Sequence, residues 1–302
     1  MLKIKGELML MLAALIWGSA FIFQKMGMDY IGPFTFGVFR FGIGALALLP
    51  VIWISDKRAV RKSLMPMSWK NRTLIMGGMV CGLANFVAGS LQQMGLVYTE
   101  AGKAGFITAM DIVIVPILLL FMRRRVHGLT WFGVVLAGFG LYLLCITDGF
   151  TVSLGDGLVM GCAVMYSFQI LSIDYYAKLV DPIKLSFYSF GLSSLLSLLV
   201  AVFAETIAFD DIMACAIPIL YTAVLEVSVA FTLQIIGQKY TPPAIATIIM
   251  SMESVFAAIS GALFLHEVMI PKEILGCVIM FVAFIIAQIP DMRESIRGEE
   301  TI

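Results

Sequence analysis

The feature that most constrains this chain is its series of long apolar stretches, separated by short polar segments. A helix that crosses the hydrocarbon core of a bilayer needs about 20 predominantly apolar residues. Stretches of that length occur at residues 7–28, 33–54, 73–96, 100–122, 129–147, 155–177, 183–204, 212–237, 242–265 and 271–290. The sequence therefore predicts an all-α membrane protein with ten transmembrane helices and a lipid bilayer as its surroundings.

The composition excludes a soluble domain. Hydrophobic residues make up 61% of the 302 residues and charged residues only 13%, with a mean hydropathy of +0.99, whereas soluble domains are roughly 25% charged. The formal net charge is zero, so nothing points to a nucleic-acid partner. The five cysteines stand singly in apolar runs without a C-x-x-C spacing, so we expect neither a metal site nor a redox cofactor.

The distribution of Lys and Arg predicts the orientation, because cytoplasmic loops are enriched in these residues. With a cytoplasmic N-terminus, ten crossings place almost all basic residues on the inside: Lys3, Lys5, Lys57, Arg58, Arg61, Lys62, Lys70, Arg72, Arg123, Arg124, Arg125, Lys178, Lys184, Lys239, Arg293 and Arg297. The outer loops carry acidic residues instead: Asp29, Asp148, Glu205, Asp210 and Asp211. Both termini are therefore expected in the cytoplasm.

The chain also repeats itself. The stretch Leu91–Val113 recurs 142 residues later as Leu233–Val255, with matched Leu, Gln, Gly, Tyr and Thr. The preceding parts align at an offset of 149, which matches Trp17 with Tyr166. Residues 1–149 and 150–302 thus form two repeats of five helices each, and an odd number inverts the second repeat. The alternative is chance similarity in a background rich in Leu, Ala and Gly.

Three carboxyl groups lie deep inside predicted helices. Asp111 is about 16 Å into its helix at 1.5 Å per residue, Glu253 occupies the matched position of the second repeat, and Glu226 is near the middle of its helix. A charge at the bilayer centre costs about 2.5–3.5 kcal/mol, so each carboxyl requires a reason. One is a protonatable site or an anchor for a substrate ammonium group. The other is a structural contact with a neighbouring helix.

Arg40 is the basic residue that lies inside a predicted helix, about 10 Å from its outer boundary. It either reaches the interface with its long side chain, clamps an anion, or pairs with a carboxylate such as Asp111. We favour the structural pair. Lys25 and Lys103 lie nearer the outer surface, and for both we expect the side chain to reach the interface.

Uncharged polar and aromatic residues share helix faces with these groups. Their spacings of three, four or seven residues align them along stripes, and such stripes predict a cavity with aromatic walls and a few orienting polar groups. Hydrogen bonding between helices is the alternative, at about 0.6 kcal/mol each. The candidate cavity residues, with the charged groups above, are Trp17, Gln24, Asn85, Gln92, Tyr166, Gln169 and Gln234.

Motifs for catalysis or nucleotide hydrolysis are absent. The sequence has no G-x-S-x-G or Walker A motif, and its only histidines, His127 and His266, lie near predicted membrane ends. An intramembrane enzyme needs a nucleophile–base set or metal ligands. We therefore do not expect an enzyme, and a built-in ATPase is excluded as the energy source.

Several short motifs make the chain resemble the EamA-type transporters of the drug/metabolite transporter superfamily. They are Trp17-Gly18, Phe39-Arg40-Phe41, Leu96 with Tyr98-Thr99, and Leu265-His266-Glu267. The resemblance covers nearly the whole chain. It implies a secondary carrier of the bacterial inner membrane, generally an exporter, with helices 1–4 and 6–9 around a central cavity and helices 5 and 10 at the periphery.

The residues and the resemblance together favour a secondary transporter of a small polar metabolite such as an amino acid, working by alternating access. A carrier or exchanger of organic anions, vitamins or drugs is the main alternative, and a passive channel or an intramembrane enzyme is a more distant one. Asp111, Glu226 and Glu253 are the candidates for proton coupling. Substrate, direction, coupling ion and oligomeric state have no signature in the sequence.

Overall fold

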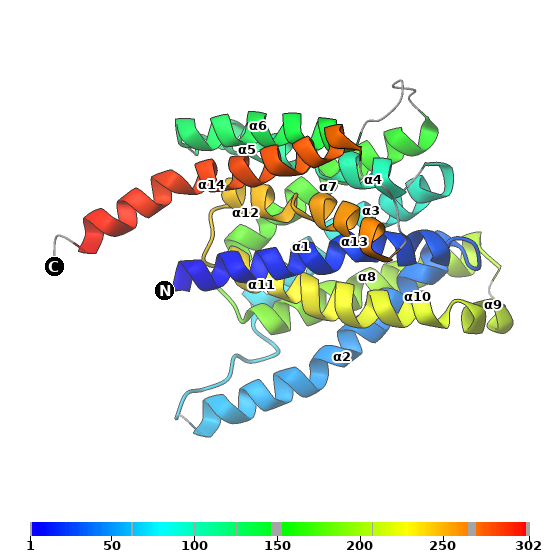
Figure 1. Ribbon diagram of the computed structural model, residues 1–302. Coiled ribbons are helices and arrows are strands. Elements are labelled where there is room, and N and C mark those ends of the chain that lie inside the picture. Colours follow the sequence, from blue (N-terminus) through cyan, green and yellow to red (C-terminus); the bar gives the residue numbers. More distant parts are fainter. Residues whose placement is uncertain are drawn as a thin grey trace.

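The computed structural model describes residues 2–61, 63–99, 101–124, 126–145, 153–206, 208–264 and 270–299. Within them the regular structure is entirely helical (Figure 1). The helices are α1 (Leu2–Gly27), α2 (Pro33–Arg61), α3 (Arg72–Tyr98), α4 (Ala101–Thr108), α5 (Asp111–Phe121), α6 (Gly128–Cys145), α7 (Leu154–Tyr176), α8 (Pro182–Ala204), α9 (Phe209–Ala214), α10 (Ala216–Tyr221), the π-helix η1 (Thr222–Phe231), α11 (Thr232–Gln238), α12 (Pro243–Met250), α13 (Glu253–Phe264) and α14 (Pro271–Glu299).

Seven helical stretches of the described chain are long and apolar enough to cross a membrane: Ile4–Gly27, Pro33–Arg61, Arg72–Tyr98, Lys103–Phe121, Leu154–Tyr176, Pro182–Ala204 and Ala216–Gln238. Two shorter apolar helical stretches, Gly128–Leu143 and Pro243–Ile259, accompany them. The prediction of an all-α, multi-pass membrane protein is confirmed. Three predicted spans, 100–122, 212–237 and 242–265, are not single α-helices but runs of shorter helices.

Some sequence predictions fall outside the described residues. They are the repeat boundary at 149 and 150, the motif Leu265-His266-Glu267, and the charged loop residues Lys62, Arg125 and Asp148.

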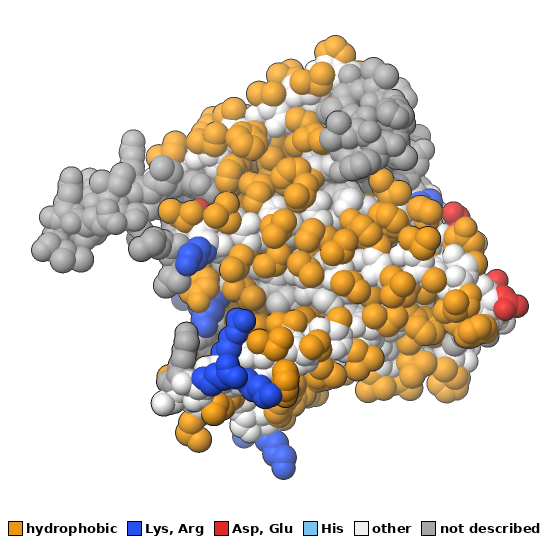
Figure 2. Space-filling model, turned by 60° about the horizontal axis from the view of Figure 1, so that its bottom comes forward, with side chains coloured by type: hydrophobic (Ala, Val, Ile, Leu, Met, Phe, Trp, Pro, Cys, Tyr) orange, Lys and Arg blue, Asp and Glu red, His pale blue; other side chains and the backbone are white. Residues whose placement is uncertain are grey.

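Charge separates the two ends of the molecule. In Figure 1 the start of α1, the end of α2 and the end of α14 lie at one end, whereas α9 lies at the other. Figure 2 shows a face covered by hydrophobic side chains, with most visible Lys and Arg gathered at one end and acidic side chains at the opposite end. We call the first the basic end, marked by Lys57, Arg58, Arg61 and Lys239, and the second the acidic end, marked by Asp29, Glu205, Asp210 and Asp211. A broad apolar surface between charged ends suits a protein surrounded by lipid.

The most extensive helix contacts are between α6 and α14, α3 and α7, and α2 and α8. The α6–α14 pair lies along one edge of the molecule (Figure 1), and small residues allow its close approach, since a Cβ on Gly140 would lie 2.9 Å from the Gly276 oxygen. Small residues at such crossings let backbones meet. The remaining helices form the body that holds the candidate site.

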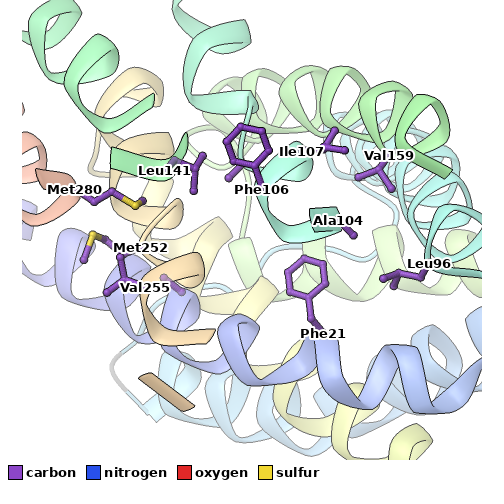
Figure 3. Packing of buried hydrophobic residues seen from close by; sticks show 12 residues of the cluster. Phe21, Leu96, Ala104, Phe106, Ile107, Leu141, Val159, Met252, Val255 and Met280 are labelled. Carbon is purple, nitrogen blue, oxygen red and sulfur yellow. The ribbon is translucent and has the colours of Figure 1, made fainter. Parts of the chain in front are cut away.

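Two apolar clusters lie on opposite sides of the breaks in the α4–α5 and α12–α13 segments. The first, drawn in Figure 3, joins Phe21 of α1, Ala104 and Ile107 of α4, and Val159 of α7. The second is built from matched positions of the other repeat, with Ile170, Ala246, Leu10 and Ile249. The breaks are thus enclosed by packed apolar side chains on both sides.

Close glycine contacts fix α7 against α3, and α1 against α11. A Cβ on Gly155 would lie 2.8 Å from the Gly95 oxygen and 3.0 Å from Tyr98 Cβ. A Cβ on Gly6 would lie 2.9 Å from the Gly237 oxygen and 3.1 Å from Tyr240 Cβ. Each residue of the second contact stands at the repeat offset from its counterpart in the first.

We predict that Gly155→Ala destabilises the protein, because its Cβ would press on backbone at the α3–α7 contact; overpacking costs about 1–3 kcal/mol. Gly157→Ala is the control, because it adds the same Cβ to the same helix with nothing within 4 Å. Thermal unfolding in detergent should give a lower Tm for Gly155→Ala alone. Equal Tm values for the two variants would contradict the close contact.

Candidate functional site

Two of the predicted buried carboxylates lie at breaks in the helices. The α4–α5 segment is interrupted at Ala109 and Met110, and Asp111 is the first residue of α5. The α12–α13 segment is interrupted at Ser251 and Met252, and Glu253 is the first residue of α13. At the first break the backbone forms hydrogen bonds from one residue to the residue three positions earlier. One of them runs from Ile112 N to the Ala109 oxygen at 3.2 Å.

The second break repeats this turn, with Ser254 N donating to the Ser251 oxygen at 3.2 Å. Each carboxylate therefore begins a half-helix, where the backbone N–H groups favour negative charge. The matched positions of the sequence repeat are matched in local structure.

The third carboxylate, Glu226, lies in the π-helix η1 (Thr222–Phe231). Such helices are rare, and they occur frequently at functional sites because the wider turn redirects a side chain. Here Ser228 Oγ donates to the Gly44 oxygen of α2 at 2.7 Å and to the Ala223 oxygen at 3.1 Å, which ties the π-helical turn to α2. The sequence places Glu226 mid-segment but carries no signal for the π-helix.

A cavity lies between these three carboxylates. Its volume, as the space open to the centre of a water molecule, is about 50 Å³, which is several times the ~10–15 Å³ that one water needs. It is a narrow cavity. Its lining residues are Trp17, Phe21, Gln24, Gln92, Thr108, Asp111, Tyr166, Gln169, Ile170, Glu226, Phe231, Gln234, Met250, Ser251 and Glu253.

The structure brings most of the predicted site residues onto this wall, from α1, α3, α5, α7, η1, α11 and α13: Trp17, Gln24, Gln92, Asp111, Tyr166, Gln169, Glu226, Gln234 and Glu253. Arg40 and Asn85 are not among the lining residues and lie behind the wall. No lining residue comes from α6 or α14. Sequence reasoning missed Thr108, Ile170, Phe231, Met250 and Ser251; the matched offsets of Thr108 with Met250 and of Phe21 with Ile170 could have suggested three of these positions.

Arg40, which does not line the cavity, forms an ion pair with the lining residue Glu226. Its Nη1 lies 3.1 Å from Glu226 Oε1, and the same oxygen accepts a hydrogen bond from Gln24 Nε2 at 3.1 Å. The guanidinium lies over the rings of Phe41 and Phe36, at 4.6 and 5.6 Å from their centroids. The expected structural pair forms, but its partner is Glu226 and not the suggested Asp111. The alternative that the Arg40 side chain reaches the membrane interface is also wrong, because this residue is only 1% exposed.

A second network fixes Gln169. Ser193 Oγ donates to backbone oxygens of Gly82 and Ser189, so it accepts the hydrogen bond from Asn85 Nδ2 at 3.1 Å. Asn85 Oδ1 then accepts from Gln169 Nε2 at 3.0 Å. Asn85 thus orients a wall residue.

Lys25 and Lys103 differ from expectation, because both have partners within the protein. Lys25 Nζ donates to the backbone oxygens of Leu96 and Thr99 at the end of α3. Lys103 Nζ lies 2.6 Å from Asp156 Oδ2, and Asp156 also accepts from Thr99 Oγ1 at 2.8 Å. Instead of reaching out to lipid headgroups, these lysines join α1 to α3 and α4 to α7.

Comparisons with known proteins agree with this architecture. The model of the EamA-like transporter family matches the chain twice, over residues 4–146 and 153–288. The chain belongs to the EamA-like transporter family. The resemblance inferred from its motifs is confirmed, and the protein is a multi-pass membrane transporter of this family.

Relatives and one solved structure extend the comparison. An uncharacterized transporter of Archaeoglobus fulgidus is 32% identical over 95% of this chain and 87% of its own length. The uncharacterized transporter YwfM of Bacillus subtilis is 23% identical over 93% of this chain and 92% of its own. A crystal structure at 15% identity superposes with a TM-score of 0.74, over 95% of this chain and 98% of that one; at this identity it shows the fold alone.

Within this transporter we predict that Arg40→Leu destabilises the fold by about 3–5 kcal/mol, because the buried Glu226 loses its counter-charge. The double variant Arg40→Leu/Glu226→Leu should recover most of that loss, since it buries no charge. Thermal unfolding in detergent measures both. Arg58→Leu, which removes an exposed arginine from the same helix, is the control and should leave Tm unchanged. A double variant no more stable than the single would contradict the pairing.

Proposed function

We propose that this EamA-family protein is a secondary active transporter that exports a small polar metabolite, such as an amino acid, across the bacterial inner membrane by alternating access. The observation that carries the proposal is the cavity lined by carboxylates from both halves of the chain. Substrate sites of such carriers lie near the bilayer midplane between repeats, at discontinuous helices. The breaks before Asp111 and Glu253 have this character.

In the proposed arrangement the chain crosses the membrane ten times, as inverted repeats 1–149 and 150–302 with both termini in the cytoplasm. The family model's two matches support the division. The glycine contacts of Gly155 with Gly95 and of Gly6 with Gly237 support the inversion, since inverted repeats place equivalent contacts at opposite membrane faces. The separation of basic and acidic ends supports a cytoplasmic basic end.

Two ion pairs are suited to close the cavity at its two ends. At the start of α7, Asp156 binds Lys103 of α4 at 2.6 Å. Near the end of α7, Asp174 binds Arg124, which follows α5, at 2.7 Å, and also contacts Lys178. One helix is thus fastened at both ends to the segment that carries Asp111. Alternating access requires one of these two ion pairs to break while the other stays formed.

We predict that Asp174→Asn opens the cavity toward the basic end and that Asp156→Asn opens it toward the acidic end, because each variant weakens one fastening. The reporter is Ser251→Cys in the cavity wall, in a background without native cysteines. A membrane-impermeant thiol reagent applied from either side of oriented vesicles measures the labelling rate. Asp210→Asn, an exposed acidic-end residue, is the control and should change nothing. Faster labelling from the same side in both variants would contradict alternating closure.

The cavity carboxylates are also the proposed sites of proton coupling. Asp111, Glu226 and Glu253 line the same cavity, and a carboxyl that alternates between water and an apolar surrounding exchanges its proton accordingly. Glu226 is held by Arg40 and Gln24. Asp111 and Glu253 make no ion pair within the described residues, so they are the better proton carriers.

We predict that Glu253→Gln abolishes proton-driven flux while the protein stays folded, because glutamine cannot exchange a proton. Proteoliposomes with a trapped pH dye, given a mixture of radiolabelled amino acids and short-chain amines, measure flux and proton movement together. The thermal unfolding midpoint checks folding, and Glu273→Gln, which lies outside the cavity, is the control. Unchanged flux and proton movement would remove Glu253 from the mechanism.

A further inference from the structure

We propose that the cavity binds a small organic cation, a protonated amine without a carboxylate, and that this amine is the transported substrate. This inference rests on the transport function proposed above and replaces its example, an amino acid, with an amine that carries no carboxylate. The charges on the cavity wall are the first observation that favours a cation. Three carboxylates line the cavity, and no Lys, Arg or His is among its lining residues. Arg40 balances only Glu226, with Nη1 at 3.1 Å from Oε1. Asp111 and Glu253 are left to face the cavity.

The unpaired hydrogen-bonding atoms of the wall are mostly acceptors. Gln24 Oε1, Gln169 Oε1 and Gln234 Oε1 are buried without a partner. For Gln24 the amide orientation is fixed because Nε2 must donate to the Glu226 carboxylate. For Gln169 it is fixed by the chain through Asn85 to Ser193. Trp17 Nε1 is a donor of the wall that also lacks a partner. The partial negative charges of these amide oxygens beside the cavity favour a cationic ligand.

Aromatic rings complete a surrounding for a cation. Trp17 and Phe231 meet edge to face at 5.0 Å, and Tyr166 lies 6.4 Å from Phe231. Phe21 is on the same wall. Ring faces attract ammonium groups, most strongly where water is excluded. Carboxylates, amide oxygens and aromatic rings together select an amine from other small polar molecules.

The same wall is unsuited to a carboxylate-bearing substrate. Binding an anion requires a cation or several N–H donors on the wall. The nearest cation, Arg40, lies behind the wall, engaged by Glu226 and covered by Phe36 and Phe41. An anionic group would therefore meet Asp111 and Glu253 without a counter-charge. The cavity wall therefore disfavours zwitterions and organic acids as ligands.

The test compares four-carbon molecules that differ in charge: 1-aminobutane, 1,4-diaminobutane, 4-aminobutanoate, butanoate and 1-butanol. Binding to the purified full chain is measured by calorimetry and by thermal shift. We expect the two amines to bind, and the acid, the zwitterion and the alcohol to bind at least about tenfold more weakly, since a lost charge-assisted hydrogen bond has that effect.

Variants then locate the binding site. Asp111→Asn and Glu253→Gln should each raise the Kd of the amines by about tenfold to a hundredfold, whereas Asp210→Asn, an exposed carboxylate, should leave it unchanged. Two independent variants are used so that one remains informative if the other does not fold. Tighter binding of butanoate or 4-aminobutanoate, no binding of either amine, or amine binding unchanged in both variants overturns the inference.

Transport assays separate this inference from the proposed function. If the reconstituted protein moves 4-aminobutanoate or butanoate and neither amine, the carrier function stands and the cationic substrate is wrong. If the amines bind at Asp111 and Glu253 but exchange across the membrane is no faster than in empty liposomes, the binding chemistry stands and the carrier function is wrong.

Discussion

The structure depends on one constraint: in hydrocarbon, every backbone N–H and C=O must find its partner within the protein. This is why the regular structure of the described chain is helical. The same constraint allows irregular backbone only where protein or a cavity surrounds it. The two breaks, before Asp111 and before Glu253, obey this rule, because packed apolar clusters flank them and both open onto the cavity. The carboxylates thus lie where the backbone of the membrane segments is least regular.

The two halves share this central feature and differ around it. Arg40 and Glu226 form a buried ion pair, while the positions at the repeat offsets from them are Ser189 and Ala84. Conversely, the hydrogen-bonded residues Asn85 and Ser193 correspond to Val227 and Gly44. These two residues pack against each other and form no side-chain hydrogen bond.

Neither polar network therefore recurs at the matched positions of the other proposed inverted repeat. A buried ion pair adds little net stability but penalises any arrangement that separates it. The two halves thus differ in their polar networks around a common pair of carboxylates.

Much of this could be predicted from the sequence, because burial in lipid leaves a strong signal. The length of the apolar stretches predicted the membrane segments. The position of the carboxylates deep inside these stretches identified them as candidate site residues. What the sequence did not reveal depends on helix rotation and local geometry. Arg40 had three carboxylates at similar depth, and only packing selects Glu226 over Asp111. Neither break contains Gly or Pro, and the π-helix around Glu226 has no known sequence signal, so the breaks and the π-helix could not be inferred.

The small volume of the cavity has an electrostatic consequence for a carrier. A charge held at the bilayer centre costs several kcal/mol, and in a cavity of about 50 Å³ only a few waters can offset it. Asp111 and Glu253 together would add two such charges, so a closed state without ligand is accessible only when protons neutralise them. An amine bound between them does the same with its own charge. Protons and substrate then compete for the same oxygens, and each must leave before the other can be carried. Under the proposed function, exchange of one for the other follows from the charge balance of the cavity and needs no separate coupling device.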